Sequence, residues 1–394
     1  MADVFERSLA LHEKLKGKMS TELKAPLENQ EDLSLLYSPG VAQPCREIAK
    51  DAEKAYDYTW KENTVAVVSN GTAVLGLGNI GAEAALPVME GKCALFKRFG
   101  GINAVPIVLR TTDPKEVIEI VKQISPTFGG INLEDIKAPE CIEIETTLKK
   151  ECNIPVFHDD QHGTAIVVTA AVINALKLVK KNAEDCTVVV SGVGAAGSSI
   201  IRMLRNLGIG NVYGFNSKGV LNLAHAEEYT NPLYKELAKI TNKNHEDLSL
   251  EEAMAKADLF IGVSVPNKIS EDMVRSMKRD PIVFAMANPD PEIDYDLARK
   301  AGARVVGTGR SDYPNQVNNV LAFPGLFKGA LSVHATEINE EMKFAAAKAL
   351  AELISEEELK DEYVIPSPFD PRVPDVVAKS VAQCAIETGV ARRR

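Results

Sequence analysis

Two pairs of adjacent carboxylates in this chain come directly after short apolar runs. Glu134 and Asp135 follow the run 131–133, and Asp159 and Asp160 follow the run 154–158. Such runs predict buried strands, and open α/β sheets bind ligands at the carboxyl ends of their strands. Because neighbouring carboxylates repel each other and neither pair has a cysteine partner, the pattern favours a site of oxygen ligands for Mg²⁺ or Mn²⁺.

A second interpretation of the Asp159–Asp160 pair is structural. An apolar helical pattern begins at Thr164, and aspartate is a preferred residue at a helix N-cap, so one aspartate could cap the helix while the other binds a cation. His158 and His162 could act as ligands of a softer metal. Since they lie on either side of the junction between strand and helix, we expect them to pack or to form hydrogen bonds instead.

Lys92 and Tyr37 are the candidate proton-transfer groups. Lys92 stands among small and apolar residues, a setting that predicts a desolvated ammonium group with a depressed pKa, as a general base near neutral pH requires. The alternative is an ordinary lysine on a solvated helix face. Tyr37 precedes a Ser-Pro-Gly turn, which predicts a position at the edge of a loop, and its alternative role is half-buried packing.

Two glycine-rich stretches fit the pattern of a dinucleotide-binding loop. The first, at 76–81, is not followed by a strand that ends in an acidic residue, so we interpret it as a tight turn or at most a phosphate or substrate loop. The second follows the apolar strand 186–191 and opens a helix at 198–207, the context that such a loop requires. Its candidate cofactor-binding residues are Gly192, Gly194, Ala195, Ala196 and Gly197.

The strand after this second loop ends at Asn216, where an acidic residue would bind the adenosine ribose and repel a 2′-phosphate. Asparagine removes that repulsion, and Lys218 could pair with the phosphate, so the sequence leans weakly towards NADP or dual use of NAD and NADP. Further parallel strands are expected at 257–265 and 281–287.

These strands and helices predict an α/β protein of two domains. The length of 394 residues is too great for one ordinary domain. We expect an N-terminal α/β substrate domain at 1–160 and a doubly wound, Rossmann-type dinucleotide-binding domain with C-terminal helices at 161–394, with the active site between them. The amphipathic segment 4–18 is expected to be a surface helix or a dimer contact.

The composition limits the other functions that this chain could have. It is 45% hydrophobic and 25% charged, as is usual for globular proteins, and its formal net charge of -10 disfavours binding to nucleic acid or to an anionic membrane surface. No apolar run of 18 residues and no secretory signal is present, so we expect a cytoplasmic protein. The six cysteines form no Cys-x-x-Cys pair and are expected to be reduced thiols.

Five stretches of the chain, in this order, closely resemble the malic enzymes of the short bacterial type. They are Tyr37-Ser-Pro-Gly-Val-Ala, Pro87-Val-Met-Glu-Gly-Lys92, Asn132-Leu-Glu134-Asp135-Ile, Phe157-His-Asp-Asp160-Gln-His-Gly-Thr-Ala and Asn318-Asn319-Val-Leu-Ala-Phe-Pro-Gly. The resemblance covers nearly the whole chain. It implies oxidative decarboxylation of L-malate to pyruvate and CO₂ with reduction of NAD or NADP, in a protein that forms dimers or larger homo-oligomers.

The resemblance also assigns roles to individual residues. Glu134, Asp135 and Asp160 would hold the divalent metal. Lys92 would take the hydroxyl proton of malate, Tyr37 would protonate the enol carbon, and Asp159 would tune Lys92 or its neighbours. Asn288 and Asn319 match positions that touch cofactor or substrate, Asn288 either of them and Asn319 the substrate.

One departure from the larger eukaryotic malic enzymes concerns the substrate. Those enzymes carry an arginine that clamps the substrate carboxylate, and Ala73 stands in its place, so the cation for the C4 carboxylate is unassigned. Three alternatives stay open. They are a malolactic-type enzyme that releases lactate and keeps its NAD, a non-catalytic nucleotide-binding regulator, and a metal-free Rossmann dehydrogenase whose activity survives EDTA.

Overall fold

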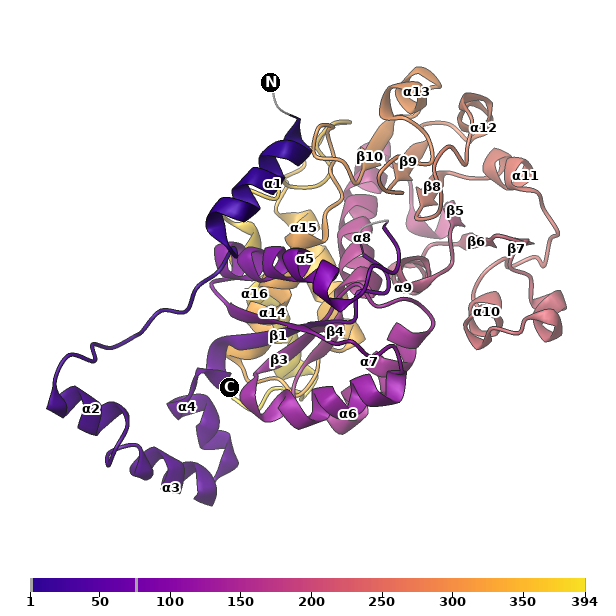
Figure 1. Ribbon diagram of the computed structural model, residues 1–394. Helices are drawn as coiled ribbons and strands as arrows, with labels where there is room; N and C mark the ends of the chain where they lie inside the picture. The colour runs from indigo at the N-terminus through magenta and orange to yellow at the C-terminus, as the bar shows by residue number, and fades with distance from the viewer. Residues whose placement is uncertain (1–2, 75–76, 394) are drawn as a thin grey trace.

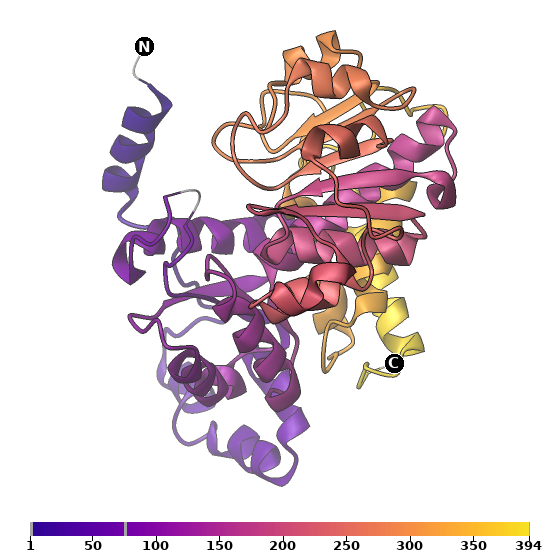
Figure 2. The same cartoon turned by 90° about the vertical axis from the view of Figure 1, so that its right-hand side faces the viewer.

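The computed structural model describes residues 3–74 and 77–393 and contains two sheets, formed one after the other along the chain (Figure 1). Helices cover the faces of both sheets, which confirms the predicted α/β class. In Figure 2 the first sheet lies below the second, and the C-terminal helices lie beside them.

The first sheet has four parallel strands in the order β2-β1-β3-β4. The strands are β1 (Thr64–Ser69), β2 (Asn103–Val108), β3 (Gly130–Leu133) and β4 (Val156–His158), and the helices between them are α5 (Ala82–Leu95), α6 (Pro114–Ile124) and α7 (Glu140–Glu151). Side chains alternate along β1: Val65 and Val67 pack on the α5 side, and Ala66 and Val68 pack on the side of α6 and α7. Both faces are therefore buried, which explains the continuous apolar run.

The second sheet has six strands in the order β10-β9-β8-β5-β6-β7, and only β7 is antiparallel to its neighbour. The strands are β5 (Thr187–Ser191), β6 (Asn211–Asn216), β7 (Gly219–Val220), β8 (Leu259–Gly262), β9 (Ile282–Ala285) and β10 (Val305–Thr308). The chain leaves β5 first towards β6 and later towards β8, so the order reverses between β5 and β8. This is a doubly wound sheet, and sheets of this kind bind ligands at the switch point.

Helices enclose the second sheet on both faces and connect it to the first. They are α8 (Asp159–Val179), α9 (Ala195–Leu207), α10 (Pro232–Ala238), α11 (Leu250–Ala255), α12 (Glu271–Ser276), α13 (Tyr295–Lys300), α14 (Phe323–Ser332), α15 (Glu340–Glu352) and α16 (Val373–Glu387). One apolar core contains Val67 of β1, Val190 of β5 and Phe327 of α14. The two sheets therefore share a core through α8 and the C-terminal helices.

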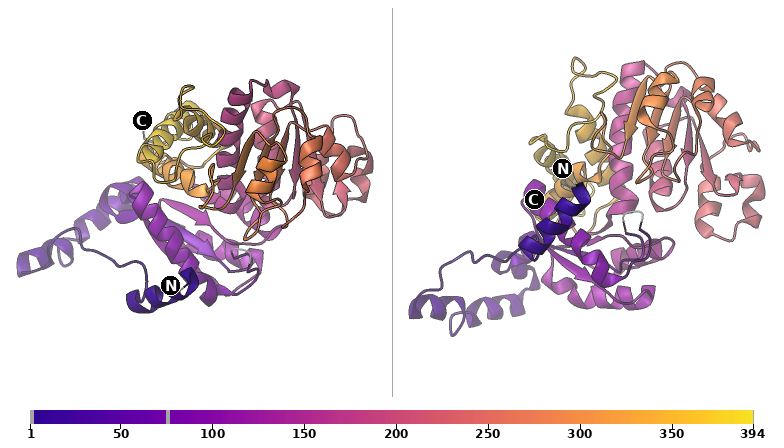
Figure 3. Two further views of the ribbon diagram at one scale, coloured as in Figure 1. Left: turned by 90° about the horizontal axis from the view of Figure 1, so that it is seen from above. Right: turned by 45° about the horizontal axis from the view of Figure 1, so that its top comes forward.

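An N-terminal arm extends away from this body (Figure 3). The arm consists of α2 (Gln30–Leu36) and α3 (Ala42–Lys50). By contrast, α1 (Val4–Leu15) lies next to α5, and α4 (Ala55–Tyr58) packs on the body through the buried Tyr56. Helices α1, α2 and α3 contain no buried residue. The helix predicted at 4–18 is therefore present but ends earlier, where Lys16 adopts a left-handed conformation.

Helix α8 is long and apolar enough to cross a membrane by length and composition, but 72% of its apolar window is buried inside the protein, as in a core helix. It begins at Asp159, five residues before the predicted start. All six cysteines are free thiols, as expected.

Candidate active site

The register of the first sheet brings the two acidic pairs together. Leu133 of β3 pairs with His158 of β4, so Glu134–Asp135 and Asp159–Asp160 leave the sheet at the same edge. The backbone N–H of Asp135 donates to Asp160 Oδ2 at 2.8 Å. One carboxylate oxygen each of Glu134, Asp135 and Asp160 lies within 4.8 Å of the other two.

This group of oxygens fits a hard divalent cation. Burial raises the pKa of Glu134 well above its usual value, against the attraction of Lys92, and the neighbouring carboxylates Asp160, Asp159 and Asp135 raise it further. A Mg²⁺ or Mn²⁺ ion would remove that repulsion, and carboxylate oxygens are the ligands that both ions prefer. Which residues bind a metal stays a prediction, but the donors that it needs converge.

Lys92 lies on α5, and its side chain reaches the acidic residues at this edge of the sheet. Its Nζ lies 2.6 Å from Asp159 Oδ2 and 2.8 Å from Glu134 Oε1, and it faces the ring of Phe323 at 4.4 Å from the centroid. Only 8% of the side chain is exposed. The lysine is thus held between two carboxylates and an aromatic face.

The predicted depression of the Lys92 pKa is wrong for this structure. Burial lowers the pKa, as expected from the apolar surroundings, but the attraction of Asp159, Glu134 and Asp160 outweighs it and leaves the pKa raised. These carboxylates are 42 to 68 positions away in the sequence, so the residues beside Lys92 could not reveal them.

Asp159 contacts both Lys92 and Asn319 and is completely buried. Its Oδ2 accepts hydrogen bonds from Lys92 and from Asn319 Nδ2, and its Oδ1 has no hydrogen-bond partner among the described residues. Burial raises the pKa of Asp159, although Lys92 opposes this. Asn319 begins a short helical turn, Asn319–Leu321, and its contact with Asp159 connects α8 to the segment before α14.

Gly163 makes this arrangement possible, although it is not among the predicted site residues. A Cβ at Gly163 would lie 2.1 Å from Asp159 Oδ1 and 3.0 Å from Asn319 Cβ. Glycine is unfavourable inside a helix, and Gly163 lies in the second turn of α8, so a packing reason could have been suspected from the sequence.

The strand-to-helix turn is held by side chains other than the aspartates. The side chain of His158 caps α8 by accepting from the Gln161 N–H at 3.2 Å, so the expectation that an aspartate caps this helix is wrong. Glu145 of α7 accepts from the His158 N–H at 3.1 Å and contacts His162 Nε2 at 2.8 Å. Burial lowers the pKa of His162 to about 4, although Glu145 raises it. Both histidines therefore form hydrogen bonds, as expected.

Tyr37 does not lie in this group. It ends α2 on the extended arm and 69% of it is exposed. Figures 1 and 3 show the arm directed away from α5, which carries Lys92. Within one chain the structure therefore does not bring the two predicted proton-transfer residues together.

The predicted dinucleotide loop lies between β5 and α9, at the switch point of the second sheet. Gly192 has φ +96°, and a Cβ there would lie 2.4 Å from the Val263 carbonyl oxygen. A Cβ at Gly197 would lie 1.8 Å from the Gly192 oxygen, whereas the space around Gly194 is open within 4 Å. Gly194 precedes α9, whose first residues are Ala195 and Ala196. Such a loop leaves room for a pyrophosphate at the helix N-terminus.

The other predicted cofactor residues lie at neighbouring strand ends. Asn216 ends β6, and its Oδ1 accepts from the N–H groups of Lys218 and Gly219 at 2.7 and 3.1 Å, so this oxygen supports the turn to β7. Asn288 follows β9 before a cis peptide bond to Pro289.

The first glycine-rich stretch lies partly outside the described residues, since 75 and 76 are not described. In its described part Val74 pairs with Gly78, and the Gly71 oxygen accepts from the N–H groups of Ile80 and Gly81 at 3.0 and 3.3 Å. These bonds are those of a closely folded loop.

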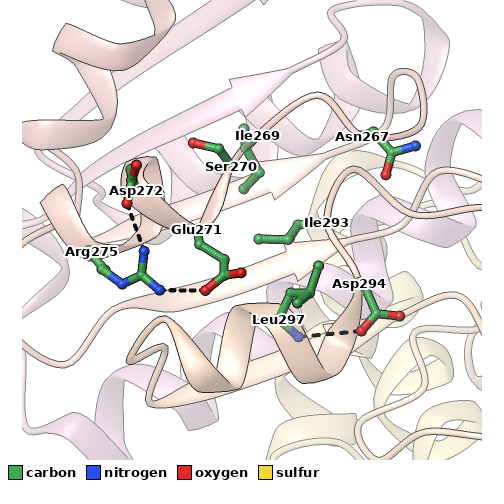
Figure 4. A pocket seen from close by; sticks show the side chains of 9 residues that line it. All are labelled: Asn267, Ile269, Ser270, Glu271, Asp272, Arg275, Ile293, Asp294 and Leu297. Atoms are coloured by element: carbon green, nitrogen blue, oxygen red, sulfur yellow. Dashed lines mark hydrogen bonds and ion pairs between the residues drawn. The ribbon is translucent and has the colours of Figure 1, made fainter.

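A surface hollow lies elsewhere, at α12 and α13 on the second sheet (Figure 4). Its most prominent contacts are ion pairs of Arg275 with Glu271 and Asp272. It contains none of the groups described above, so we do not assign the chemistry to it.

Comparison with known proteins agrees with this geometry. The family described as malic enzyme, N-terminal domain, matches residues 16–149, and the malic enzyme NAD-binding domain matches residues 161–299 and 302–386. The bifunctional malic/malolactic enzyme of Bacillus subtilis (strain 168) is 58% identical over 98% of this chain and 94% of its own length. The NAD-dependent malic enzyme of Geobacillus stearothermophilus is 54% identical over 100% of this chain and 81% of its own.

A solved structure has the same fold over the whole chain. The crystal structure of malic enzyme from Pyrococcus horikoshii Ot3 has a TM-score of 0.95 and 46% identity, and the match covers 100% of this chain and 93% of that one.

Proposed function

The chain belongs to the malic enzyme family, and we infer that it catalyses oxidative decarboxylation of L-malate to pyruvate and CO₂ with reduction of a nicotinamide dinucleotide. The observation that carries this inference is the contact of Lys92 with Asp159 and Glu134 at the edge where the acidic residues meet. A lysine, an aspartate and a hard-cation site together are suited to deprotonating an alcohol that is being oxidised.

Glu134, Asp135 and Asp160 would hold the divalent metal, and the 192–197 loop with Asn216, Lys218 and Asn288 would hold the cofactor. When bound, the metal supplies a Lewis acid for the C2 oxygen of malate and the cofactor supplies the acceptor for the C2 hydride. Asn319 and Asn288 are the proposed substrate contacts. In this proposal residues 1–160 form the substrate and metal domain, and residues 161–394 form the NAD(P)-binding domain.

Lys92 and Asp159 act as one acid–base pair. Because the surrounding carboxylates raise its pKa, Lys92 is protonated in the state described here and must lose a proton before it can accept one. Asp159 Oδ2 is 2.6 Å away and already accepts a hydrogen bond from Lys92, so its position makes it the acceptor. Lys92 then takes the C2 hydroxyl proton of malate as the alcohol is oxidised.

Tyr37 donates the last proton, to C3 of the enol left after CO₂ departs, and it acts in the site of a second copy of this chain. Tyr37 and its neighbours Leu35, Leu36 and Val41 are all exposed, and helices α2 and α3 of the arm contain no buried residue. An apolar patch of this kind is typical of a surface that a partner covers. A homodimer would bury the arm and bring Tyr37 to Lys92 of the partner chain.

The direct test is malate-dependent absorbance at 340 nm with Mn²⁺, measured with NAD and NADP in parallel. We expect reduction that disappears with EDTA and in Lys92→Ala. It should persist in the matched control Lys97→Ala, because the Lys97 ammonium group donates to Asn103 on an exposed surface, away from the acidic residues. Activity that survives EDTA would instead support a metal-free dehydrogenase. The faster cofactor would establish the preference that Asn216 and Lys218 leave open.

A malolactic activity is the second candidate, because a relative 58% identical to this chain is named a bifunctional malic/malolactic enzyme. It converts malate to lactate at the same site and keeps its cofactor. Lactate formed without net change at 340 nm would demonstrate it. Failure to form either product would support a non-catalytic nucleotide-binding protein.

A further inference from the structure

Glu292 is a buried carboxylate that the proposed chemistry does not use. It lies in the loop between β9 and α13, and none of its surface is exposed. Its Oε1 accepts from the Ser264 N–H at 2.7 Å and from the Ser264 hydroxyl at 3.1 Å, and its Oε2 accepts from the Ala287 N–H at 3.0 Å. The carboxylate therefore holds the chain immediately after β8 and immediately after β9.

The environment of Glu292 is unusual for a buried acid. Across residues 3–74 and 77–393, no lysine, arginine or histidine forms an ion pair with it. A buried charge without a cation is costly, and a buried glutamate whose only role is packing would be replaced by an apolar side chain at little cost. The carboxylate accepts three hydrogen bonds, two of them from backbone N–H groups, which indicates that its role is to hold that backbone in place.

The chain around Glu292 is shaped to receive it. A Cβ at Gly262, the last residue of β8, would lie 2.3 Å from the Glu292 carboxyl carbon. Ser264 also contacts Ser191 Oγ at 3.0 Å, at the end of β5 and beside Gly192. Glu292 thus ties the carboxyl ends of β8 and β9 to the end of β5, where the dinucleotide loop begins.

The topology identifies which half of the cofactor these strand ends serve. The adenosine ribose is read at the end of β6, on one side of the switch point between β5 and β8. A dinucleotide that crosses the switch point places its other half over β8 and β9. Asn288 comes directly after Ala287, whose N–H Glu292 holds.

We propose that Glu292 is a positioning residue for the nicotinamide half of the cofactor: its carboxylate fixes the backbone at the ends of β8 and β9 against which that half binds. The proposal rests on the proposed function only for the identity of the cofactor. Glutamine in place of Glu292 keeps the volume but turns an amide NH₂ towards one of the backbone N–H donors, so one strand end loses its acceptor.

The test is direct binding by the full-length protein without malate. NADH is titrated by its fluorescence, and ADP, which carries only the adenosine half, is titrated by calorimetry. For Glu292→Gln we expect NADH to bind about tenfold more weakly, with ADP affinity changed less than about twofold. The matched control is Asp258→Asn, because Asp258 is a buried carboxylate at the opposite end of the same sheet, where it accepts from the Thr187 N–H at 2.9 Å. It should lower the melting temperature and leave both affinities unchanged.

Equal weakening of NADH and ADP, or no weakening of NADH, would overturn the proposal. If Glu292→Gln does not fold, Ser264→Ala decides, because it removes only the hydroxyl contacts with Glu292 and Ser191. It should weaken NADH binding about two- to threefold with ADP unchanged, and unchanged NADH binding would overturn the proposal. A wild-type protein that binds NADH but does not convert malate would refute the proposed function and leave this inference standing.

Discussion

Gly163→Ala is the smallest substitution that tests how the site is built. The added methyl group would lie 2.1 Å from Asp159 Oδ1, whereas an ordinary contact begins at 3.4 Å, so the two groups must separate by about 1.3 Å. Asn319 Cβ, at 3.0 Å, is a second close contact of the added methyl group. The carboxylate must therefore shift relative to Lys92, from which Oδ2 is now 2.6 Å distant.

A displacement of about 1 Å in a proton-transfer group costs on the order of 100-fold in rate, or about 2.7 kcal/mol in the activation free energy. We expect kcat to fall by roughly that factor. The Mn²⁺ concentration for half-maximal activity should change much less, because Asp159 is not among the three proposed metal ligands. Alanine normally stabilises a helix relative to glycine by about 0.5–1 kcal/mol, so a lowered melting temperature would measure the clash itself.

Steady-state kinetics and thermal melts of Gly163→Ala supply the assay. The control for the helix effect is Gly91→Ala in α5. Among the described residues, apart from the neighbouring backbone of α5 itself, no atom lies within 4 Å of the added methyl group, so this substitution should raise the melting temperature. A folded Gly163→Ala protein whose kcat stays within about twofold of wild type would refute the argument that Asp159 must keep its position.

Three further predictions follow from the same structure. If Tyr37 acts across a dimer, subunit exchange between the inactive variants Tyr37→Phe and Lys92→Ala should restore about one quarter of wild-type activity. Half of the dimers are then hybrids, and each hybrid has one complete site out of two. No recovery of activity would mean that both residues act in the site of the same chain. Asp160→Asn should raise the Mn²⁺ concentration for half-maximal activity about tenfold or more, and an unchanged metal requirement would exclude Asp160 as a ligand. Burial lowers the pKa of Lys61 to about 8, below its unfolded value of about 10.4. Between these two pH values the unfolded state binds one more proton than the folded state. The free energy of unfolding should therefore rise with pH across that window, by up to about 3 kcal/mol. Urea unfolding at pH 7.5 and 10 should show this gain in wild type and not in Lys61→Met.

The strands and helices could be predicted from the sequence because the pattern of apolar residues in each one matches the side chains that are buried. Val65, Val67 and Val189 lie in strands covered on both faces, and such strands appear as unbroken apolar runs. The second glycine loop was readable for the same reason, since a strand and a helix flank it. Helix α8 was placed too late, because its first turn consists of the polar residues of the site and its cap is a histidine.

The electrostatic state of the site was not readable, because it depends on pairs far apart in the chain. Lys92 looked like a lysine in apolar surroundings, and only the fold shows that Asp159 and Glu134 contact its Nζ. The role of Gly163 is of the same kind, since its constraint comes from the approach of Asn319. Local sequence reports burial well, but the sign of a pKa shift depends on the charges that burial brings together.

The position of Tyr37 limits what a single chain can do. The other proposed proton-transfer groups, Lys92 and Asp159, are buried, whereas Tyr37 is exposed on the arm. The chain before the arm is joined to α5 at Lys18, whose N–H donates to Glu90 Oε2 at 3.0 Å. Glu90 is two residues from Lys92 on α5, so the arm is anchored next to the group that it does not reach. The extended arm with its exposed apolar residues is the basis for our proposal that Tyr37 completes the site of another chain.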